Sequence, residues 1–108
     1  MVFPSLRAVI EVRGCFWHGH DCPMFRWPTT RSEFWLEKIV ANIARDARNR
    51  EALLDYGWRI AEVWECQLKG RRRRPVDEVV AELAGFLRSA TPYQSIGVPR
   101  TVTISEEP

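Results

Sequence analysis

Three thiols and one imidazole in this chain have the residue types and spacing of a zinc site. Cys15, His20 and Cys22 lie within eight residues, and the third cysteine, Cys66, follows 44 residues later. Soft thiolate and imidazole ligands in a set of four are what tetrahedral structural zinc prefers. His20 fits better than His18, because a chelate from Cys15 to His18 would pinch two bulky aromatic residues in a tight loop. The pattern predicts zinc on these four residues, and the alternative is three buried, inert cysteines near an incidental histidine.

Two adjacent aromatic residues and a spare imidazole, Phe16, Trp17 and His18, stand between the expected ligands. They lie in a loop rather than in a periodic stripe, so both rings cannot easily be buried in the core. An exposed ring could wedge into a base step of DNA. The alternative is that the two rings cover the zinc site as a small satellite core.

The elements that position these residues follow from periodicity and breaker residues. Thr30–Glu33 has capping-box spacing before an apolar stripe of helical period, and Gly57 is a natural C-terminal stop. That stripe consists of Leu36, Ile39, Val40, Ile43 and Ala47. We expect, in order, an extended segment Val2–Val12, a loop Cys15–Pro28, a helix Thr30–Tyr56, a strand Trp58–Trp64, a basic loop Lys69–Arg74 and a helix from Pro75 to Leu87.

This order predicts a small α/β domain whose mixed sheet is flanked by helices and carries a zinc loop. The pattern alone does not decide whether its strands run parallel or antiparallel. With 108 residues, 45% of them hydrophobic and 28% charged, the chain fits one globular domain over residues 1–90. The polar segment 91–108 is expected to be a loosely ordered tail.

Three cysteines cannot all pair with one another, so we expect a reducing, cytoplasmic compartment rather than a disulfide framework. No apolar run approaches the ~18 residues that cross a bilayer, so no membrane association is expected.

Arginine accounts for 14 of the 16 basic residues, which favours a nucleic-acid partner because arginine recognises phosphate and guanine edges in a planar, bidentate way. Lys38 and Asn42 share a helix face at i, i+4 and could contact base edges, although such pairs are often only solvated. The run Arg71–Arg74 could contact phosphate or remain a solvated loop.

Several segments together closely resemble the very-short-patch-repair (Vsr) DNA mismatch endonucleases. They are Gly14–His18, His20-x-Cys22, Thr30–Ile39, Asn42, Gly57–Arg59 and Val63–Cys66. The resemblance covers Val2 to about Lys69 and includes the spacing from Cys22 to Cys66. It implies a restriction-endonuclease-like fold and the nicking of one DNA strand 5′ to the thymine of a T·G mismatch, in DNA repair.

The resemblance also implies roles for single residues. His18 would be the general base, or its close partner, and magnesium would bridge a carboxylate and the scissile phosphate. The DNA contacts would come from Phe16, Trp17, Trp35, Lys38 and Asn42. The expected partner is a double-stranded DNA with a T·G mismatch, bound by a monomer.

Two positions depart from the family pattern. The family's metal-binding aspartate would fall immediately before Met1, so we expect the chain to begin inside the nuclease domain. The histidine before Gly-Cys-Phe-Trp is replaced by Arg13, which can stabilise phosphate charge but cannot accept a proton. Glu11 and Arg13 resemble half of the restriction-nuclease signature, so Glu11 could help to hold a metal, or it is a solvated carboxylate at a strand edge.

Three hypotheses follow. The chain is a mismatch-nicking endonuclease lacking its N-terminal segment, or a catalytically impaired DNA-binding remnant of that family. A zinc-stapled protein-interaction module is the third, but it leaves Trp35, Lys38 and Asn42 unexplained.

Overall fold

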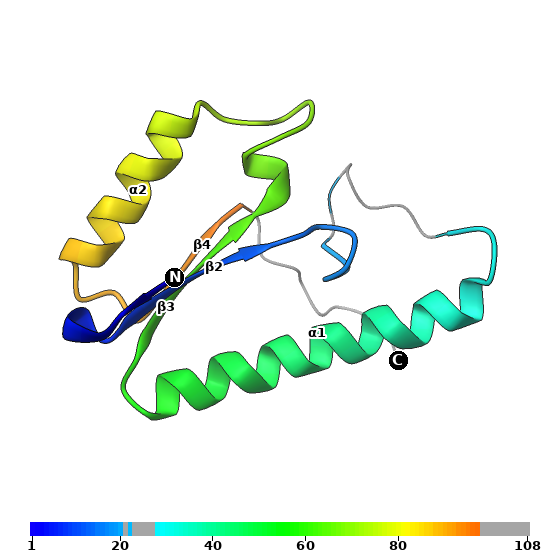
Figure 1. Ribbon diagram of the computed structural model, residues 1–108, viewed down its shortest axis with the longest axis horizontal. Coiled ribbons are helices and arrows are strands. Elements are labelled where there is room, and N and C mark those ends of the chain that lie inside the picture. The colour runs from blue at the N-terminus through cyan, green and yellow to red at the C-terminus, as the bar shows by residue number, and fades with distance from the viewer. Residues whose placement is uncertain (21, 23–27, 98–108) are drawn as a thin grey trace, which may run out of the picture.

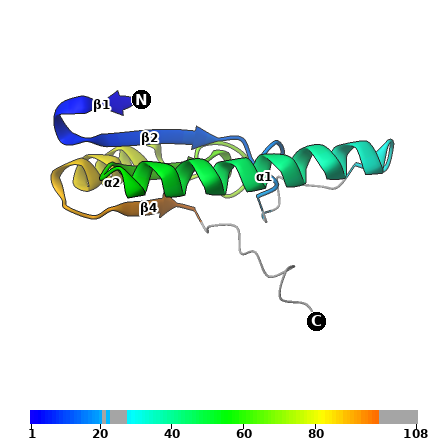
Figure 2. The ribbon, with the colours of Figure 1, turned by 90° about the horizontal axis from the view of Figure 1, so that it is seen from below.

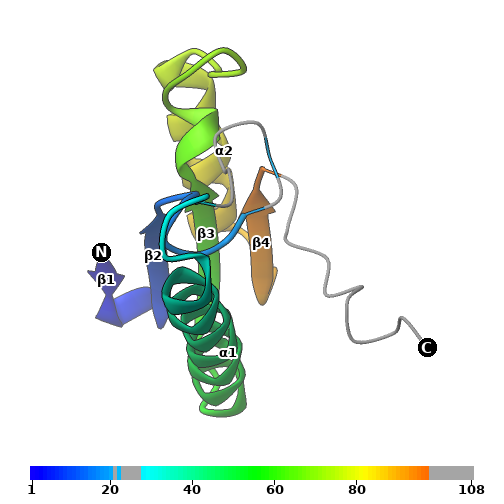
Figure 3. The ribbon, with the colours of Figure 1, turned by 90° about the vertical axis from the view of Figure 1, so that its right-hand side faces the viewer.

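The computed structural model describes residues 1–20, 22 and 28–97. Its elements are β1 (Val2–Phe3), the 3-10 turn η1 (Pro4–Leu6), β2 (Ala8–Arg13), α1 (Ser32–Asp55), β3 (Arg59–Trp64), the 3-10 turn η2 (Glu65–Gln67), α2 (Val76–Arg88) and β4 (Tyr93–Ile96). The strands form one sheet in the order β1-β2-β3-β4, in which β2, β3 and β4 are parallel and β1 is antiparallel to β2 (Figure 3). Helices α1 and α2 cover opposite faces of the sheet (Figures 1 and 2). The predicted fold class, a small α/β domain with a mixed sheet, is confirmed.

The sheet has one apolar face and one face that mixes apolar and charged side chains. On the apolar face, α2 contributes Val79 and Phe86 to a core that also contains Ala8, Ile10, Ala61, Val63 and Ile96. On the other face, α1 covers side chains that alternate with these, because successive residues of a strand point to opposite sides. This mixed face presents charged residues, Arg13 and Glu62 among them, to α1, and the candidate site lies on this side.

The N-terminal segment is not one extended stretch, as the sequence indicated, but a short hairpin. Pro4 begins η1, and Arg7 turns the chain in the left-handed region with a φ of 49°. Strand β1 consequently folds back onto β2, where Val2 pairs with Val9.

Helix α1 ends close to the predicted position, at Asp55, and Gly57 follows with a φ of +82°. Its start differs from the expectation, because Arg31 in a left-handed conformation precedes Ser32 and no side chain caps the helix. The expected apolar stripe is only partly buried: Ile39 is enclosed, whereas Leu36 and Val40 are about half exposed. Along α1, Ile39 and Asp46 are buried, so an apolar and a charged side chain share its inner face.

Strand β3 has the two faces that its sequence indicates, with Ala61 and Val63 on the apolar side and Glu62 on the other. Lys69–Arg74 forms a loop, and α2 begins directly after Pro75 as predicted. Of the stripe predicted for α2, Val79 and Phe86 are buried and Leu83 and Leu87 pack partly against the core, whereas Val76 and Val80 are exposed.

Tyr93–Ile96 form the edge strand β4, where the sequence indicated the start of a polar tail. This short polar segment joins the sheet because Ile96 packs in the apolar core and the Tyr93 hydroxyl donates to Glu62 on the opposite face. Residues 98–108 of the expected tail lie outside the described residues. No helix in the described part of the chain is long and apolar enough to cross a membrane.

Candidate metal centre and active site

The structure gathers the four predicted zinc ligands at the carboxyl ends of β2 and β3. The ligand atoms of Cys15, His20, Cys22 and Cys66 all lie within 4.8 Å of one another. His20 Nδ1 is 3.6 Å from Cys15 Sγ and 3.7 Å from Cys66 Sγ. Zinc–sulfur bonds of about 2.3 Å and zinc–nitrogen bonds of about 2.0–2.1 Å in a tetrahedron require separations of about 3.6 Å between such atoms. The donor set and its spacing therefore fit zinc.

Neighbours from two elements, β3 and η2, support this Cys/His group. The indole of Trp64 stacks on the His20 ring, with centroids 4.1 Å apart and planes at 7°. The backbone N–H of Cys15 donates to Glu65 Oε1 over 3.1 Å. Cys15 and Cys66 are both buried. The imidazole is thus held in place from outside the ligand set, as metal-binding histidines generally are.

Burial raises the pKa of the Cys15 and Cys66 thiols. A thiol in such an environment becomes a thiolate only when a strong positive charge is placed beside it, which a divalent zinc ion supplies. A divalent metal ion at this Cys/His group would therefore favour the thiolate forms of its cysteines.

The ligand loop lies directly on α1. Gly19 has a φ of +58°, and a Cβ at this position would come within 2.7 Å of Ile39 Cγ2 and 2.9 Å of Ile43 Cδ1. Asn42 Nδ2 donates to the carbonyl of Trp17 over 2.8 Å. Asn42, expected as a base reader, is thus also a residue that holds the loop on the helix.

Phe16, Trp17 and Trp35 form a trio of rings with centroids 5.3–5.5 Å apart, all edge to face. Trp17 is 51% exposed, and Phe16 and Trp35 are half-buried. Trp64 stacks on the Cys/His group, whereas Phe16 and Trp17 contact Trp35 of α1. The trio forms a partly exposed aromatic surface beside the N-terminal part of α1, where Lys38 is also exposed.

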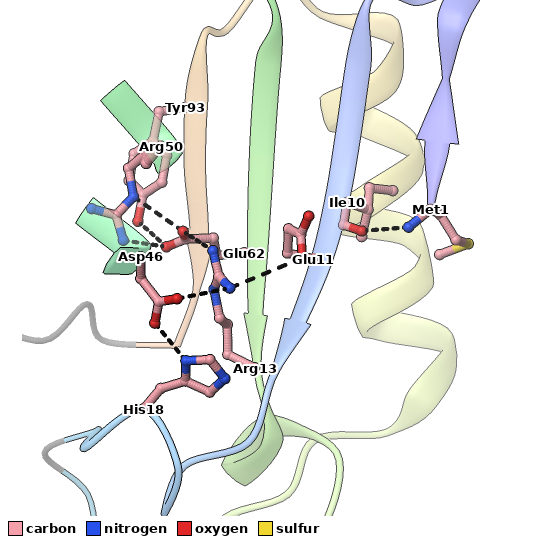
Figure 4. Close-up of polar contacts among 9 residues, drawn as sticks. All are labelled: Met1, Ile10, Glu11, Arg13, His18, Asp46, Arg50, Glu62 and Tyr93. Carbon is pink, nitrogen blue, oxygen red and sulfur yellow. Dashed lines mark hydrogen bonds and ion pairs between the residues drawn. The ribbon is translucent and has the colours of Figure 1, made fainter. Parts of the chain in front are cut away.

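His18, which lies outside the metal-binding group, contacts a carboxylate instead. Its Nδ1 is 2.5 Å from Asp46 Oδ2, and Asp46 comes from the middle of α1 (Figure 4). A carboxylate at Nδ1 orients the imidazole and favours the tautomer whose Nε2 keeps its lone pair. The His18 side chain is 23% exposed, so the pair lies at the edge of the polar interior.

A buried ionic network continues inward from Asp46. Arg13 Nη1 is 3.3 Å from Asp46 Oδ1, and Arg13 Nη2 is 3.1 Å from Glu62 Oε2. Arg50 donates to both oxygens of Glu62, over 3.0 and 3.1 Å, and the Tyr93 hydroxyl donates to Oε1 over 2.9 Å. Figure 4 shows Glu62 at the centre of this network, between β4, α1 and the end of β2.

Burial alone would raise the pKa of Glu62, but the hydrogen bonds and charge of Arg50, with Tyr93 and Arg13, hold that pKa below its ordinary value. The same burial raises the pKa of Tyr93, and the Glu62 charge adds to the effect. Glu62 is therefore a fully buried carboxylate that stays ionised.

Comparison with known proteins gives several nicking enzymes as relatives, while no family model matches the chain. The DNA mismatch endonuclease Vsr of Escherichia coli K12 is 49% identical over 81 residues, which are 75% of this chain and 51% of that protein. The chain is a relative of the Vsr endonucleases. A type II nicking enzyme of Xanthomonas oryzae, V.XorIIP, is 53% identical over 68 residues, or 63% of this chain and 50% of that one. Another of Neisseria meningitidis, V.NmeAIP, is 36% identical over 85 residues, or 77% of this chain and 61% of that one.

The chain spans about half the length of the first two of these Vsr relatives. Its described part contains one group of three or more histidine, cysteine or carboxylate side chains placed to hold a metal, the Cys/His group. Glu11, expected as a possible metal ligand, is 42% exposed and lies 4.0 Å from Arg13 Nη1. Magnesium takes six oxygens in near-octahedral geometry. In the described part of the chain no group of three carboxylates gathers to hold magnesium, so the magnesium site stays a prediction.

The sequence patterns did not single out four residues that form the ionic network with Arg13 and His18. These are Asp46, Arg50, Glu62 and Tyr93. One signal was present: Asn42, Asp46 and Arg50 follow at i, i+4 and i+8, on one helical face. A second was Glu62, which alternates with Ile60 and Trp64 in an otherwise apolar strand face. Neither signal names its partners, because these lie on elements distant in the sequence.

Proposed function

We propose that the chain carries the DNA-recognition and zinc elements of a mismatch-specific nicking endonuclease that cuts 5′ to the thymine of a T·G pair. One observation supports this most directly. His18, oriented by Asp46, directly follows the half-exposed Trp17 on a loop that four metal ligands staple to the sheet. The relatives named above are a mismatch endonuclease and nicking enzymes, which favours the same activity.

In this proposal the aromatic trio recognises the mismatch. A T·G pair stacks less well than a matched pair, so inserting a ring beside it costs less unstacking energy. Trp17 is exposed and next to Phe16, and Trp35 supports both rings from α1. Lys38, one turn further along α1, would contact the base edges or the adjacent phosphate.

His18 then acts on the attacking water. With its Nδ1 proton donated to Asp46, Nε2 can take a proton from water, and Asp46 stabilises the imidazolium that results. Arg13 holds the second oxygen of Asp46 and thereby fixes the carboxylate. Structural zinc would rigidify the loop and takes no part in the proton transfer.

A second candidate function is mismatch binding without cleavage, and one observation favours it. Arg13 stands where the family pattern has a histidine, and both ends of its guanidinium are engaged by Glu62 and Asp46. A permanently protonated, ion-paired group cannot exchange protons with substrate.

The test is a strand-specific nicking assay on end-labelled T·G and T·A duplexes with magnesium, together with binding to the same duplexes. Cleavage 5′ to the mismatched thymine that is lost in His18→Ala supports the nuclease. Mismatch-selective binding without cleavage selects the second candidate. Equal binding to both duplexes without cleavage contradicts both.

A further inference from the structure

A basic loop, Lys69–Arg74, leaves the sheet three residues after the metal ligand Cys66. In Figure 1 it is part of the chain that arches from η2 to the start of α2, beyond the carboxyl ends of β2 and β3. The metal-binding loop leaves the same edge of the sheet from β2. Two loops with different chemistry therefore flank one edge, one aromatic and one cationic.

The base of the basic loop is fixed by backbone hydrogen bonds. The N–H of Lys69 donates to the carbonyl of Glu65 over 3.0 Å, and that of Arg74 donates to Gln67 over 2.8 Å. Gly70 turns the chain with a φ of +94°, and its carbonyl accepts from Arg73. The loop thus begins and ends at a defined place beside the metal centre.

The loop concentrates the positive charge of the protein. It contains five of the 16 cationic residues and no acidic one, so the formal net charge of +2 for the chain becomes −3 for the other 102 residues. Carboxylates neutralise two of the five. Arg74 is paired with Glu78 and Glu82, and Lys69 is paired with Glu65.

The other three cations lack a carboxylate partner of this kind in the described part of the chain, and the guanidinium of Arg73 donates to the Gly70 carbonyl over 3.1 Å. Arg71, Arg72 and Arg73 are exposed, and none of them is within 4.0 Å of a carboxylate among the described residues. Three adjacent like charges repel one another, so they cost free energy in the isolated protein. Binding to a polyanion recovers that energy.

We propose that Arg71, Arg72 and Arg73 bind the phosphate backbone of duplex DNA beside the stretch contacted by the metal-binding loop. The inference rests on the proposed function, because it assumes that the aromatic surface engages DNA. Duplex DNA carries one negative charge per about 1.7 Å of its axis, so three adjacent guanidinium groups can meet several phosphates at once. The loop has no aromatic or amide side chain to read a base, and it therefore contributes affinity without sequence or mismatch preference.

The test compares Arg71→Gln/Arg72→Gln/Arg73→Gln with two single controls. Arg74→Gln removes a loop cation that is already neutralised by Glu78 and Glu82. Arg88→Gln removes an exposed cation at the far end of α2, about 20 Å away at 1.5 Å per residue. Binding to T·G and T·A duplexes of roughly 20 base pairs is measured by fluorescence anisotropy from ~50 to ~300 mM salt.

The triple variant should bind both duplexes roughly tenfold or more weakly at low salt, because each phosphate contact contributes about 0.9 to the slope of log K against log salt. That slope should fall by about 2 to 3, while the ratio of T·G to T·A affinity stays unchanged. Arg88→Gln and Arg74→Gln should keep nearly the wild-type slope. Thermal unfolding by circular dichroism verifies that the triple variant is folded.

Wild-type affinity and slope in the folded triple variant would overturn the inference, and so would a loss confined to the T·G duplex. Lost affinity for single-stranded RNA with unchanged duplex binding would overturn it in favour of an RNA partner. If the wild-type chain binds duplexes through this loop but without mismatch preference, the proposed function is contradicted. The inference about phosphate binding by the loop is then still supported. A chain that binds no duplex would contradict both.

Discussion

The guanidinium of Arg13 lies 3.1 Å from the carboxylate of Glu62, which is fully buried. The positive charge of Arg13 at the candidate site is therefore neutralised by Glu62 of the neighbouring strand β3. The same guanidinium reaches Asp46, so Glu62 is linked to His18 through three contacts, by way of Arg13 and Asp46.

Replacing Glu62 should destabilise the protein strongly. Glu62→Gln leaves Arg13 and Arg50 partly buried with a weaker partner, and breaking a buried pair in this way typically costs about 3–5 kcal/mol. Urea unfolding at neutral pH measures the loss. Glu37→Gln, which changes an exposed carboxylate on α1, is the matched control and should remain near the wild-type value.

The contribution of Glu62 should also depend on pH. Because its folded-state pKa lies below the ordinary value of about 4.3, the stabilisation is complete above that pH and is lost as the pH falls through the folded-state pKa. The free energy of unfolding should consequently fall less steeply below about pH 4.3 in Glu62→Gln than in Glu37→Gln. Parallel pH profiles for the two variants would contradict the assignment.

Replacing Arg13 by the histidine of the family pattern should destabilise the protein. Arg13→His withdraws the donors to Glu62 and Asp46 and should cost about 1–3 kcal/mol. Together with Glu62→Gln, the two losses should be non-additive by about 0.5–3 kcal/mol in a double-mutant cycle followed by urea unfolding. Additive losses would mean that the 3.1 Å contact does not couple the residues.

The two histidines of the loop should differ in their effect on metal. His20→Ala should lose about one equivalent of zinc, because it removes one of four ligands, whereas His18→Ala should keep it. Elemental analysis of the purified proteins measures the content. Zinc retained in His20→Ala and lost in His18→Ala would reverse the assignment.

Gly19 should be intolerant of a side chain. Gly19→Ala places a Cβ 2.7 Å from Ile39 Cγ2 at a φ of +58°, and strain of this kind costs about 1–3 kcal/mol. Gly85→Ala in α2 is the control, since nothing lies within 4 Å of its Cβ and alanine favours a helix by about 1 kcal/mol. Thermal unfolding should therefore shift downward for the first variant and upward or not at all for the second.

Local sequence patterns were sufficient for the features that depend on local chemistry. The ligand spacing predicted the Cys/His group. The periodicity of apolar residues, together with glycine and proline at element ends, located α1, β3 and α2 within a few residues. The roles of Phe16, Trp17, Lys38 and Asn42 in DNA binding stay predictions.

What escaped prediction depends on tertiary contacts. The apolar stripe of α1 suggested an apolar docking face, but α1 rests on the sheet through Asp46 and Arg50. Strand β4 is short and polar, and it forms because Ile96 completes a core made by distant elements. Periodicity cannot show that Glu62 is paired, since its partners come from β2, α1 and β4.

The central claim is tested most directly by the ratio of binding affinities for T·G and T·A duplexes that are otherwise identical. The zinc-loaded chain should prefer the T·G duplex, and Phe16→Ala/Trp17→Ala should reduce that preference, because stacking contributes about 1–3 kcal/mol per base. Phe34→Ala, which removes an exposed ring of α1 that contacts Trp35 alone of the trio, should leave the ratio close to the wild-type value. An equal affinity of the wild-type chain for both duplexes, or a preference that survives the loss of both loop rings, would contradict the account.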